Sequence, residues 1–503
     1  MMQYTNVNEA LSALHEIEAK RSALSHAMAI IYFDSATVAP KNTTEGRAHT
    51  LGILSGYMYE LAANPNNKTL ISYLKEHENA LSLEEKRRAE LFRKECEQIS
   101  RIPEEEFTEF QILLSRAGDV WEKAKVENDF PAFAPYLEKI VEFNRKFAGY
   151  YNPEIPAYDA LLNEFEEGVT MEILDEFFDK LRAAIVPLLA KIKEKEPIDD
   201  SFLNKNYPIE RQRTFSDYLM EVLGIDRGYC GIAETEHPFT ENFNNKDVRI
   251  TTHYYENDLA SSMFSVIHEG GHAIYELGCK DEYNHTMLAG GVSMGIHESQ
   301  SRFFENLIGR SEAFVSYIYP KLKEIFPEQL KDVSANDFYR AVNKSTPSLI
   351  RTEADELTYC LHIMVRYEIE KQLIGDTLSV SELPHEWNRL YKEYLGVDVP
   401  NDTMGCLQDT HWSGGSFGYF PSYALGSAYG AQMLHAMKKD LGDIETKTAE
   451  GDLSAVKAWL KDHIHQHACL YAPGELLEKT CGKFDATYYI DYLTAKFTNL
   501  YSL

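Results

Sequence analysis

The chain lacks any excess of positive charge. Its 503 residues include 50 lysines and arginines against 79 aspartates and glutamates, which gives a formal net charge of −29. Nucleic acids and anionic membrane surfaces are bound through positively charged footprints. We therefore expect neither a nucleic acid nor a membrane as a partner, and any site for an anionic ligand must be a local basic spot in a repulsive field.

Cysteine is scarce, and long hydrophobic runs are lacking. The seven cysteines are an odd number, widely scattered and without a C-x-x-C pair, so they indicate reduced thiols and no disulfide framework. The longest early apolar run, 27–33, is far too short to cross a bilayer. The first twenty residues are amphipathic and have no continuous apolar core of the kind that a secretory signal needs. We expect a cytoplasmic protein.

Internal repeats, low-complexity tracts and long Pro/Gly linkers are lacking too, and the polar stretch 196–206 is the nearest approach to a linker. The patterns that are present are mainly helical. Thr170 is placed to cap a segment with an apolar stripe at helical spacing, and comparable stripes occur at 11–30, 83–99 and 357–373. The stripe after Thr170 consists of Ile173, Leu174, Phe177, Phe178, Leu181, Ile185, Leu188 and Ile192.

The best strand candidate is 247–254, which is rich in β-branched residues. It immediately precedes a segment that reads His268-Glu269-Gly270-Gly271-His272. On a helix, this H-E-x-x-H spacing puts both histidines on one face, where two neutral imidazoles reach a single Zn²⁺ at about 2.0–2.1 Å. Glu269 between them is placed to take a proton from a water molecule.

Two glycines lie inside this motif, and each disfavours a helix by about 1 kcal/mol relative to alanine. A helix that accepts both indicates a close approach by substrate or by another helix. The alternative for the motif as a whole is a buried helix with two hydrogen-bonded histidines.

A catalytic zinc needs three protein ligands. The next apolar-faced segment contains His297-Glu298 and then Glu305, and we choose Glu298 as the third ligand. His297 and Glu305 compete with it, but His297 projects about a hundred degrees away from Glu298 on a helix, so only one of those two can face the metal. The alternative for Glu298 is an i, i+4 pair with Arg302.

Six ordered motifs now resemble one family. They are Phe33-Asp34-x-x-Thr37-x-x-Pro40, His237-Pro238-Phe239, Asp247-Val248-Arg249-Ile250-Thr251, the zinc motif with His297-Glu298-Ser299 after it, Ile350-Arg351-Thr352-Glu353-Ala354-Asp355, and Gly405-Cys406-Leu407-Gln408-Asp409-Thr410-His411-Trp412. With them the chain resembles zinc metallocarboxypeptidases of the carboxypeptidase Taq (thermostable carboxypeptidase) family over essentially its whole length. Phe33 stands where the family usually has Trp, a departure that concerns packing, and two glycines in the zinc motif are less usual than one.

The resemblance implies hydrolysis of the C-terminal bond of peptides with a free carboxylate, with broad specificity, by a homodimer that holds one Zn²⁺ per chain; similar sites also take Co²⁺ or Mn²⁺. The implied fold is mainly α, a neurolysin-like helical body with a deep substrate cleft and a small β-sheet beside the zinc-motif helix. We expect one catalytic domain, 1–503, in which 1–200 is mainly a helical wall of the cleft and 201–503 holds the zinc site and the substrate-binding part.

The planar guanidinium of Arg351 suits a peptide's terminal carboxylate, and the alternative is a local salt bridge with Glu353 or Asp355. Arg249 is the second candidate for this anchor, although Asp247 shares its strand face and is an equally good partner. His237, in the H-P-F motif, belongs either to a rigid turn or to a wall of the substrate site.

His411 and Tyr423 lie in a stretch rich in glycine and aromatics, which suits donors to a developing oxyanion. Related oligopeptidases of the neurolysin type have a His and a Tyr at the same separation, and the alternative for Tyr423 is simple packing. Gln408 and Asp409 are expected to orient neighbouring groups.

Two other functions are compatible with the sequence. A neurolysin-type oligopeptidase would share the zinc motif and helical fold but cut internally, and a non-catalytic helical scaffold would use the metal structurally. A di-iron bundle is disfavoured because it needs a Glu-x-x-His motif on each of two helices, and the His297-Glu298 segment does not supply a second one beside Glu269 and His272.

Overall fold

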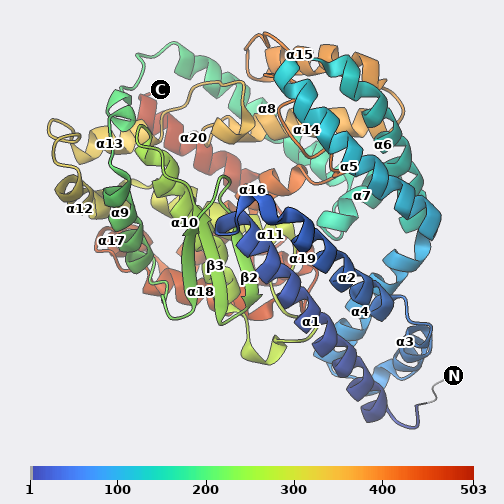
Figure 1. Ribbon diagram of the computed structural model, residues 1–503. Helices are drawn as coiled ribbons and strands as arrows, with labels where there is room; N and C mark the ends of the chain where they lie inside the picture. Colours follow the sequence, from blue (N-terminus) through green and yellow to red (C-terminus); the bar gives the residue numbers. More distant parts are fainter. Residues whose placement is uncertain (1–3) are drawn as a thin grey trace.

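The computed structural model describes residues 4–503, so residues 1–3 of the expected domain lie outside the described part (Figure 1). Helices make up the N-terminal third of the chain. They are α1 (Val7–Thr37), α2 (Thr44–Ala62), α3 (Asn66–Glu76), α4 (Leu83–Arg101), α5 (Glu104–Glu127), α6 (Phe130–Tyr151), α7 (Ala157–Phe165) and α8 (Met171–Lys193).

The remaining part inserts three strands after one helix and then returns to helices. Its elements are α9 (Ile209–Val222), β1 (Cys230–Glu234), β2 (Thr240–Asn244), β3 (Asp247–Thr252), α10 (Leu259–Gly278), α11 (Met294–Arg302), the π-helix η5 (Phe303–Gly309), α12 (Glu312–Ile325), α13 (Ala335–Val342), the short η6 (Arg351–Glu353), α14 (Tyr359–Ile374), α15 (Leu383–Tyr394), α16 (Pro421–Leu441), α17 (Ile444–Ala449), α18 (Ser454–His463), α19 (Pro473–Cys481) and α20 (Thr487–Tyr501).

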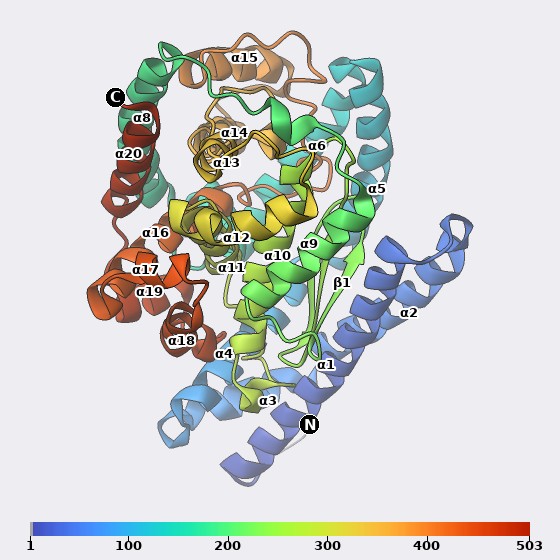
Figure 2. The same ribbon diagram turned by 90° about the vertical axis from the view of Figure 1, so that its left-hand side faces the viewer.

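The small sheet has the order β1-β3-β2, with β1 parallel and β2 antiparallel to β3. Successive side chains of a strand point to opposite faces. Thr240 and Asn242 of β2 reach α10, whereas Phe243 of β2 and Arg249 of β3 reach Phe33 of α1. The sheet therefore separates α1 from α10, and Figure 2 shows α1 and α2 along the outer side of the strands. A mainly helical body with a small sheet beside the metal-motif helix is confirmed.

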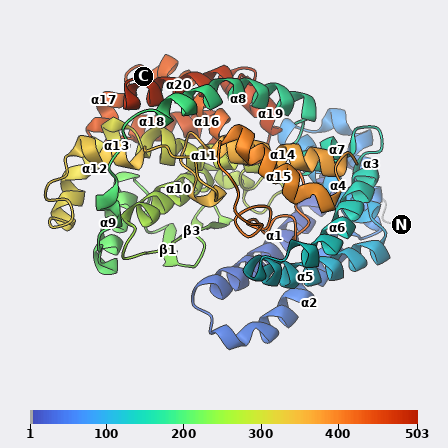
Figure 3. The same ribbon diagram turned by 90° about the horizontal axis from the view of Figure 1, so that it is seen from above.

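Two groups of buried side chains hold these elements together. One continuous core runs from Phe110 in α5 to Tyr501 in α20 and contains the buried faces of α10, α11, α14 and α16. A separate small cluster joins α1, α3 and α4 through residues such as Leu14, Leu70 and Phe92. Figure 3 shows α10, α11 and α14 in the middle of the body. The helices that carry the zinc motif and Glu298, α10 and α11, are therefore interior ones.

Two close contacts bring the interior helices together. A Cβ atom on Gly271 would lie 2.6 Å from the backbone oxygen of Gln300 and 2.8 Å from Cα of Ser301, so α10 and α11 touch backbone to backbone. On α16, a Cβ atom on Gly426 would lie 2.6 Å from Cβ of Glu298. The close approach predicted for the motif glycines is thus made by another helix, α11, at Gly271, whereas Gly270 faces the side chains of Leu223 and Ile225.

The expected helices all form, with small differences at their ends. The stripes at 11–30, 83–99 and 357–373 lie in α1, α4 and α14, and the Thr170 side chain caps α8 by accepting from the Ile173 amide. Ile173 itself is 39% exposed, whereas its neighbour Leu174 is fully buried, so Ile173 lies on the solvent side of the stripe. The predicted strand 247–254 ends at Thr252, since β1 offers no partner beyond Glu234. Strands β1 and β2 were not predicted, because neither alternates apolar and polar residues.

None of the helices among residues 4–503 combines the length and the apolar character needed to cross a membrane.

The contact at Gly271 leads to a stability prediction. Gly271→Ala gains about 1 kcal/mol of helix propensity but forces a methyl group into the α11 backbone, and overpacking of this kind destabilises by about 1–3 kcal/mol or more. We expect a lower melting temperature in thermal unfolding followed by circular dichroism. Gly270→Ala is the matched control, because its Cβ would meet only the flexible ends of Leu223 and Ile225. Equal melting temperatures for the two variants would contradict the contact.

Candidate active site

The metal motif lies on α10, in the form that the sequence predicts. The helix begins after Asp258, whose side chain accepts from the Ser261 amide at 3.1 Å. The rings of His268 and His272 project from the same face, with centroids 5.0 Å apart. Their Nε2 atoms point toward a carboxylate supplied by α11.

That carboxylate is Glu298. Its Oε2 atom lies 3.7 Å from Nε2 of His268 and 3.7 Å from Nε2 of His272. Its Oε1 atom accepts from Nε of Arg302 at 2.7 Å. One oxygen thus makes the ion pair with Arg302 that was the alternative for this residue, while the other faces the histidines. These three residues could hold one metal ion between them.

The two competitors for the third position lie behind the histidines. Glu305, in the π-helix η5, has Oε2 2.8 Å from Nδ1 of His268. His297 has Nδ1 2.7 Å from Nδ1 of His272. With each Nδ1 hydrogen-bonded, each Nε2 is left free to bind a metal. Two imidazoles and one carboxylate match a catalytic zinc site with three protein ligands, so the residues present fit this ion.

Glu269, which stands between the two ligand histidines in the sequence, is buried, and the small sheet holds its carboxylate in place. The hydroxyl of Thr240 on β2 donates to its Oε2 at 2.6 Å. Burial raises the pKa of Glu269, against the opposing effect of His268. A carboxylate with a raised pKa is a stronger base, which suits a group that takes a proton from water near neutral pH.

His411 and Tyr423 come together at the start of α16. Nε2 of His411 lies 3.4 Å from the Tyr423 hydroxyl, and both rings pack against Tyr419. Burial, together with the charge of Arg351, lowers the pKa of His411 to about 4, so this imidazole is neutral at pH 7. Burial also raises the pKa of Tyr423, so its phenol keeps its proton and can donate it to an anion.

The loop from 411 to 420 is fixed by Glu370, a fully buried carboxylate on α14. It accepts from the Trp412 indole at 2.8 Å, from the Gly418 amide at 2.8 Å and from the Tyr158 hydroxyl at 2.7 Å. Burial raises the pKa of Glu370 to about 7. The loop that carries His411 is therefore tied to the core at both ends.

Arg351 lies in η6, but its partner is Asp409 and not Glu353 or Asp355. Its Nε and NH2 atoms lie 3.0 and 2.8 Å from Oδ1 of Asp409, and Arg366 donates to Oδ2 at 2.7 Å. Burial acts to raise the pKa of Asp409, but the two guanidinium groups outweigh it and hold this pKa well below its usual range. Two cations around one anion leave a net positive charge in an acidic protein, which suits an anionic group of a ligand.

Tyr359 joins the metal-ligand cluster to this basic spot. Its ring lies under the Arg302 guanidinium, 4.4 Å from ring centroid to Cζ, and its hydroxyl accepts from NH1 of Arg351 at 3.3 Å. Arg351 also lies over the Tyr423 ring, at 5.1 Å. A continuous set of contacts therefore runs from Glu298 through Arg302 and Tyr359 to Arg351 and Tyr423.

The structure does not bring Arg249 or His237 into this set. Arg249 pairs with Asp247 and stacks on Phe33 and Phe243, on the face of the sheet opposite Thr240. His237 is exposed in the connection between β1 and β2.

Several residues of the site escaped the sequence reasoning. Thr240 and Tyr359 carry no motif, and their roles come from tertiary contacts. From the sequence, Arg302 was identified only as a partner of Glu298.

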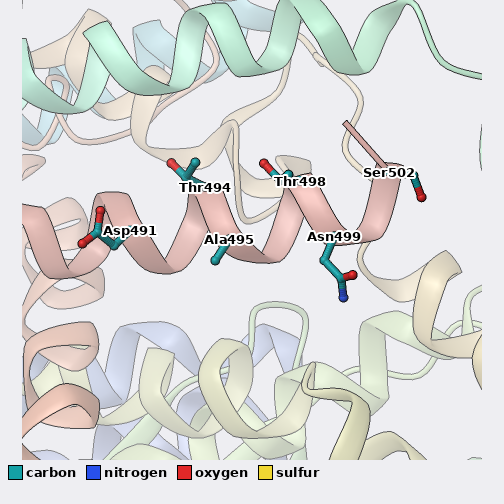
Figure 4. Close-up of a pocket in the computed structure, with 6 residues that line it drawn as sticks. All are labelled: Asp491, Thr494, Ala495, Thr498, Asn499 and Ser502. Atoms are coloured by element: carbon teal, nitrogen blue, oxygen red, sulfur yellow. The ribbon is translucent and has the colours of Figure 1, made fainter.

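A hollow of about 670 Å³ along α20 is lined by one carboxylate, Asp491, and by none of the predicted site residues, so it is unrelated to this site (Figure 4).

Comparison with known proteins agrees with this geometry. Residues 13–497 match the family model described as carboxypeptidase Taq (M32) metallopeptidase. The chain is 44% identical over 484 residues to carboxypeptidase 1 of Bacillus subtilis, covering 96% of this chain and 97% of that protein. It is 36% identical to thermostable carboxypeptidase 1 of Pyrococcus furiosus, covering 94% and 96%.

Solved structures show the same similarity. The M32 carboxypeptidase of Deinococcus radiodurans superposes with a TM-score of 0.94 at 35% identity, covering 98% of this chain and all of that one. For metallocarboxypeptidase 1 of Trypanosoma cruzi the TM-score is 0.93 at 31% identity, with 98% and 99% covered. The chain therefore belongs to the carboxypeptidase Taq (M32) family of metallopeptidases, and it is a metallocarboxypeptidase.

Proposed function

We propose that this metallocarboxypeptidase holds one Zn²⁺ between His268, His272 and Glu298 and releases C-terminal residues from peptides of broad sequence. The observation that carries the proposal is the convergence of two Nε2 atoms on one carboxylate oxygen, at 3.7 Å each, beside a buried glutamate. Co²⁺ or Mn²⁺ would suit the same donors. When bound, such an ion polarises a carbonyl and lowers the pKa of a water molecule towards about 7.

Glu269 acts as the general base in this proposal. Its carboxylate takes a proton from the attacking water and passes it to the leaving amine. The hydrogen bond from Thr240 supports this role, because it fixes one carboxylate oxygen of Glu269 in place. The charge that develops on the carbonyl oxygen is stabilised by the Tyr423 hydroxyl, with neutral His411 beside it.

Arg351 is proposed to anchor the terminal carboxylate of the substrate. Its net-positive pairing with Asp409 and Arg366 supports this role, as does its position over Tyr423. Arg351 is a direct neighbour of the proposed oxyanion donor Tyr423, as release of one residue at a time requires. Arg249 remains the second candidate for the anchor.

Further parts of the proposal concern the whole chain. Residues 1–503 form one catalytic domain in which 1–200 walls a deep substrate cleft, and His237 contributes to a wall of the substrate site. The protein acts as a homodimer in the cytoplasm. The family resemblance supports the dimer, and the seven free cysteines support a reducing compartment.

Replacement of the general base gives the first test of the mechanism. Glu269→Gln should keep its metal but lose most turnover, a rise of several kcal/mol in the barrier, because the amide takes up no proton. Metal content and kcat on a short peptide measure this. Glu241→Gln is the control, since Glu241 is a half-buried carboxylate on the same strand as Thr240 but on its opposite face. Near-normal turnover in Glu269→Gln would refute the mechanism.

The anchor is tested with paired substrates. Arg351→Ala should lower kcat/KM about 10- to 100-fold on free-acid peptides, in line with about 1.5–3 kcal/mol for a hydrogen bond to a charged group, and far less on C-terminally amidated ones. Mass analysis of the products also shows whether single C-terminal residues are released. An oligopeptidase that cuts internally would release longer fragments. Equal losses on both substrates would make Arg351 structural, and a selective loss in Arg249→Ala would transfer the role to Arg249.

The oxyanion donor is tested on α16. Tyr423→Phe should lower kcat about 10²- to 10³-fold with little change in KM, because the lost donor acts on the transition state. Tyr429→Phe is the matched control, a buried phenol on the same helix that faces Glu166. An unchanged kcat in Tyr423→Phe would leave this tyrosine a packing role only.

A further inference from the structure

The two ligand histidines are supported in different ways. Nδ1 of His268 meets the Glu305 carboxylate directly, at 2.8 Å. Nδ1 of His272 meets Nδ1 of a second imidazole, His297, at 2.7 Å, and Nε2 of His297 lies 2.7 Å from Oε1 of Glu276. The carboxylate of Glu276 therefore reaches His272 only indirectly, through the imidazole ring of His297.

Only one placement of protons satisfies this chain when His272 binds a metal. Its Nε2 must carry a lone pair, so its proton is on Nδ1 and is donated to Nδ1 of His297. His297 must then carry its own proton on Nε2 and donate it to Glu276. The reverse order, with His297 donating to His272, would put the His272 proton on Nε2 and remove the lone pair that a metal needs.

Glu276 is held rigidly enough to impose this order. It lies one turn after His272 on α10 and is 3% exposed. Its Oε1 atom also accepts from the Gly291 amide at 3.1 Å, and its Oε2 atom accepts from the Asn242 amide group on β2. These neighbours all donate, so the carboxylate is left as the acceptor for His297.

The ring of His297 is held as well. It packs edge-on against Tyr275 with centroids 5.1 Å apart and lies 4.7 Å from the His272 ring. A Cβ atom on Gly291 would lie 2.5 Å from its Cδ2 atom. The imidazole therefore has little freedom to turn away from His272.

We propose that Glu276 and His297 are positioning residues that fix the tautomer and orientation of His272 and thereby strengthen metal binding at the active site. Neither touches the metal or the substrate. This inference rests on the proposed site of His268, His272 and Glu298, and it adds that a hydrogen-bonded His–His–Glu chain, reaching from α11 back to α10, is needed for the site to bind its ion tightly.

The test measures Zn²⁺ affinity by competition with a chromogenic chelator, on metal-stripped protein, with no substrate present. Glu276→Gln and His297→Phe should each weaken binding about 10- to 100-fold, the usual effect of losing a partner that orients a ligand. His297→Phe keeps an aromatic ring against Tyr275 and removes both nitrogen atoms. Melting temperatures of the metal-free variants, which a purely structural role would lower, should stay close to that of the unaltered chain.

Glu370→Gln is the matched control, because Glu370 is equally buried and accepts three hydrogen bonds but contacts neither α10 nor α11 ligands. It should bind Zn²⁺ as the unaltered chain does. Affinities within twofold of the unaltered chain in both Glu276→Gln and His297→Phe would overturn the inference. Unaltered affinity in His272→Ala would instead overturn the proposed metal site itself, so the two failures can be told apart.

Discussion

The whole catalytic centre depends on how closely α10 and α11 approach each other. The two backbones touch at Gly271, with no side chain between them. Since a carboxylate reaches only a few ångströms beyond its backbone, Glu298 can meet the histidines of α10 only at such a distance. The same contact also brings Arg302 and Glu305, which follow Glu298 in the chain, next to the proposed ligands.

Each proposed ligand is fixed from behind by a different element. His268 is hydrogen-bonded to Glu305 of the π-helix, His272 to His297 of α11, and Glu298 to Arg302. Groups held in this way have little rotational freedom left to lose when an ion binds. The acidic charge of the chain is offset locally, because guanidinium groups lie where buried carboxylates would otherwise repel one another.

Which contacts could be predicted from the sequence depends on how far apart the partners lie in the chain. The helical class, the motif helix and the pairing of His268 with His272 follow from spacings within one helix, where direction is set by 100° per residue. The choice of Glu298 on the next helix came from resemblance to known zinc peptidases and not from spacing. The partner of Arg351 could not be found this way, because Asp409 is 58 residues further on and only packing of η6 against the loop unites them. Strands β1 and β2 escaped for a related reason, since their pairing with β3 and not their composition stabilises them.

Gly426 on α16 lies against Glu298, on the helix that carries the proposed oxyanion donor Tyr423. With no space for even a methyl group, these two residues belong to one rigid frame whose internal spacing the chain cannot adjust. An engineer who wants a different substrate preference should therefore leave α10, α11 and α16 untouched. The adjustable surfaces are the peripheral ones, such as α1 and α2, where the aromatic side chains of Tyr32 and Tyr57 are each about half exposed.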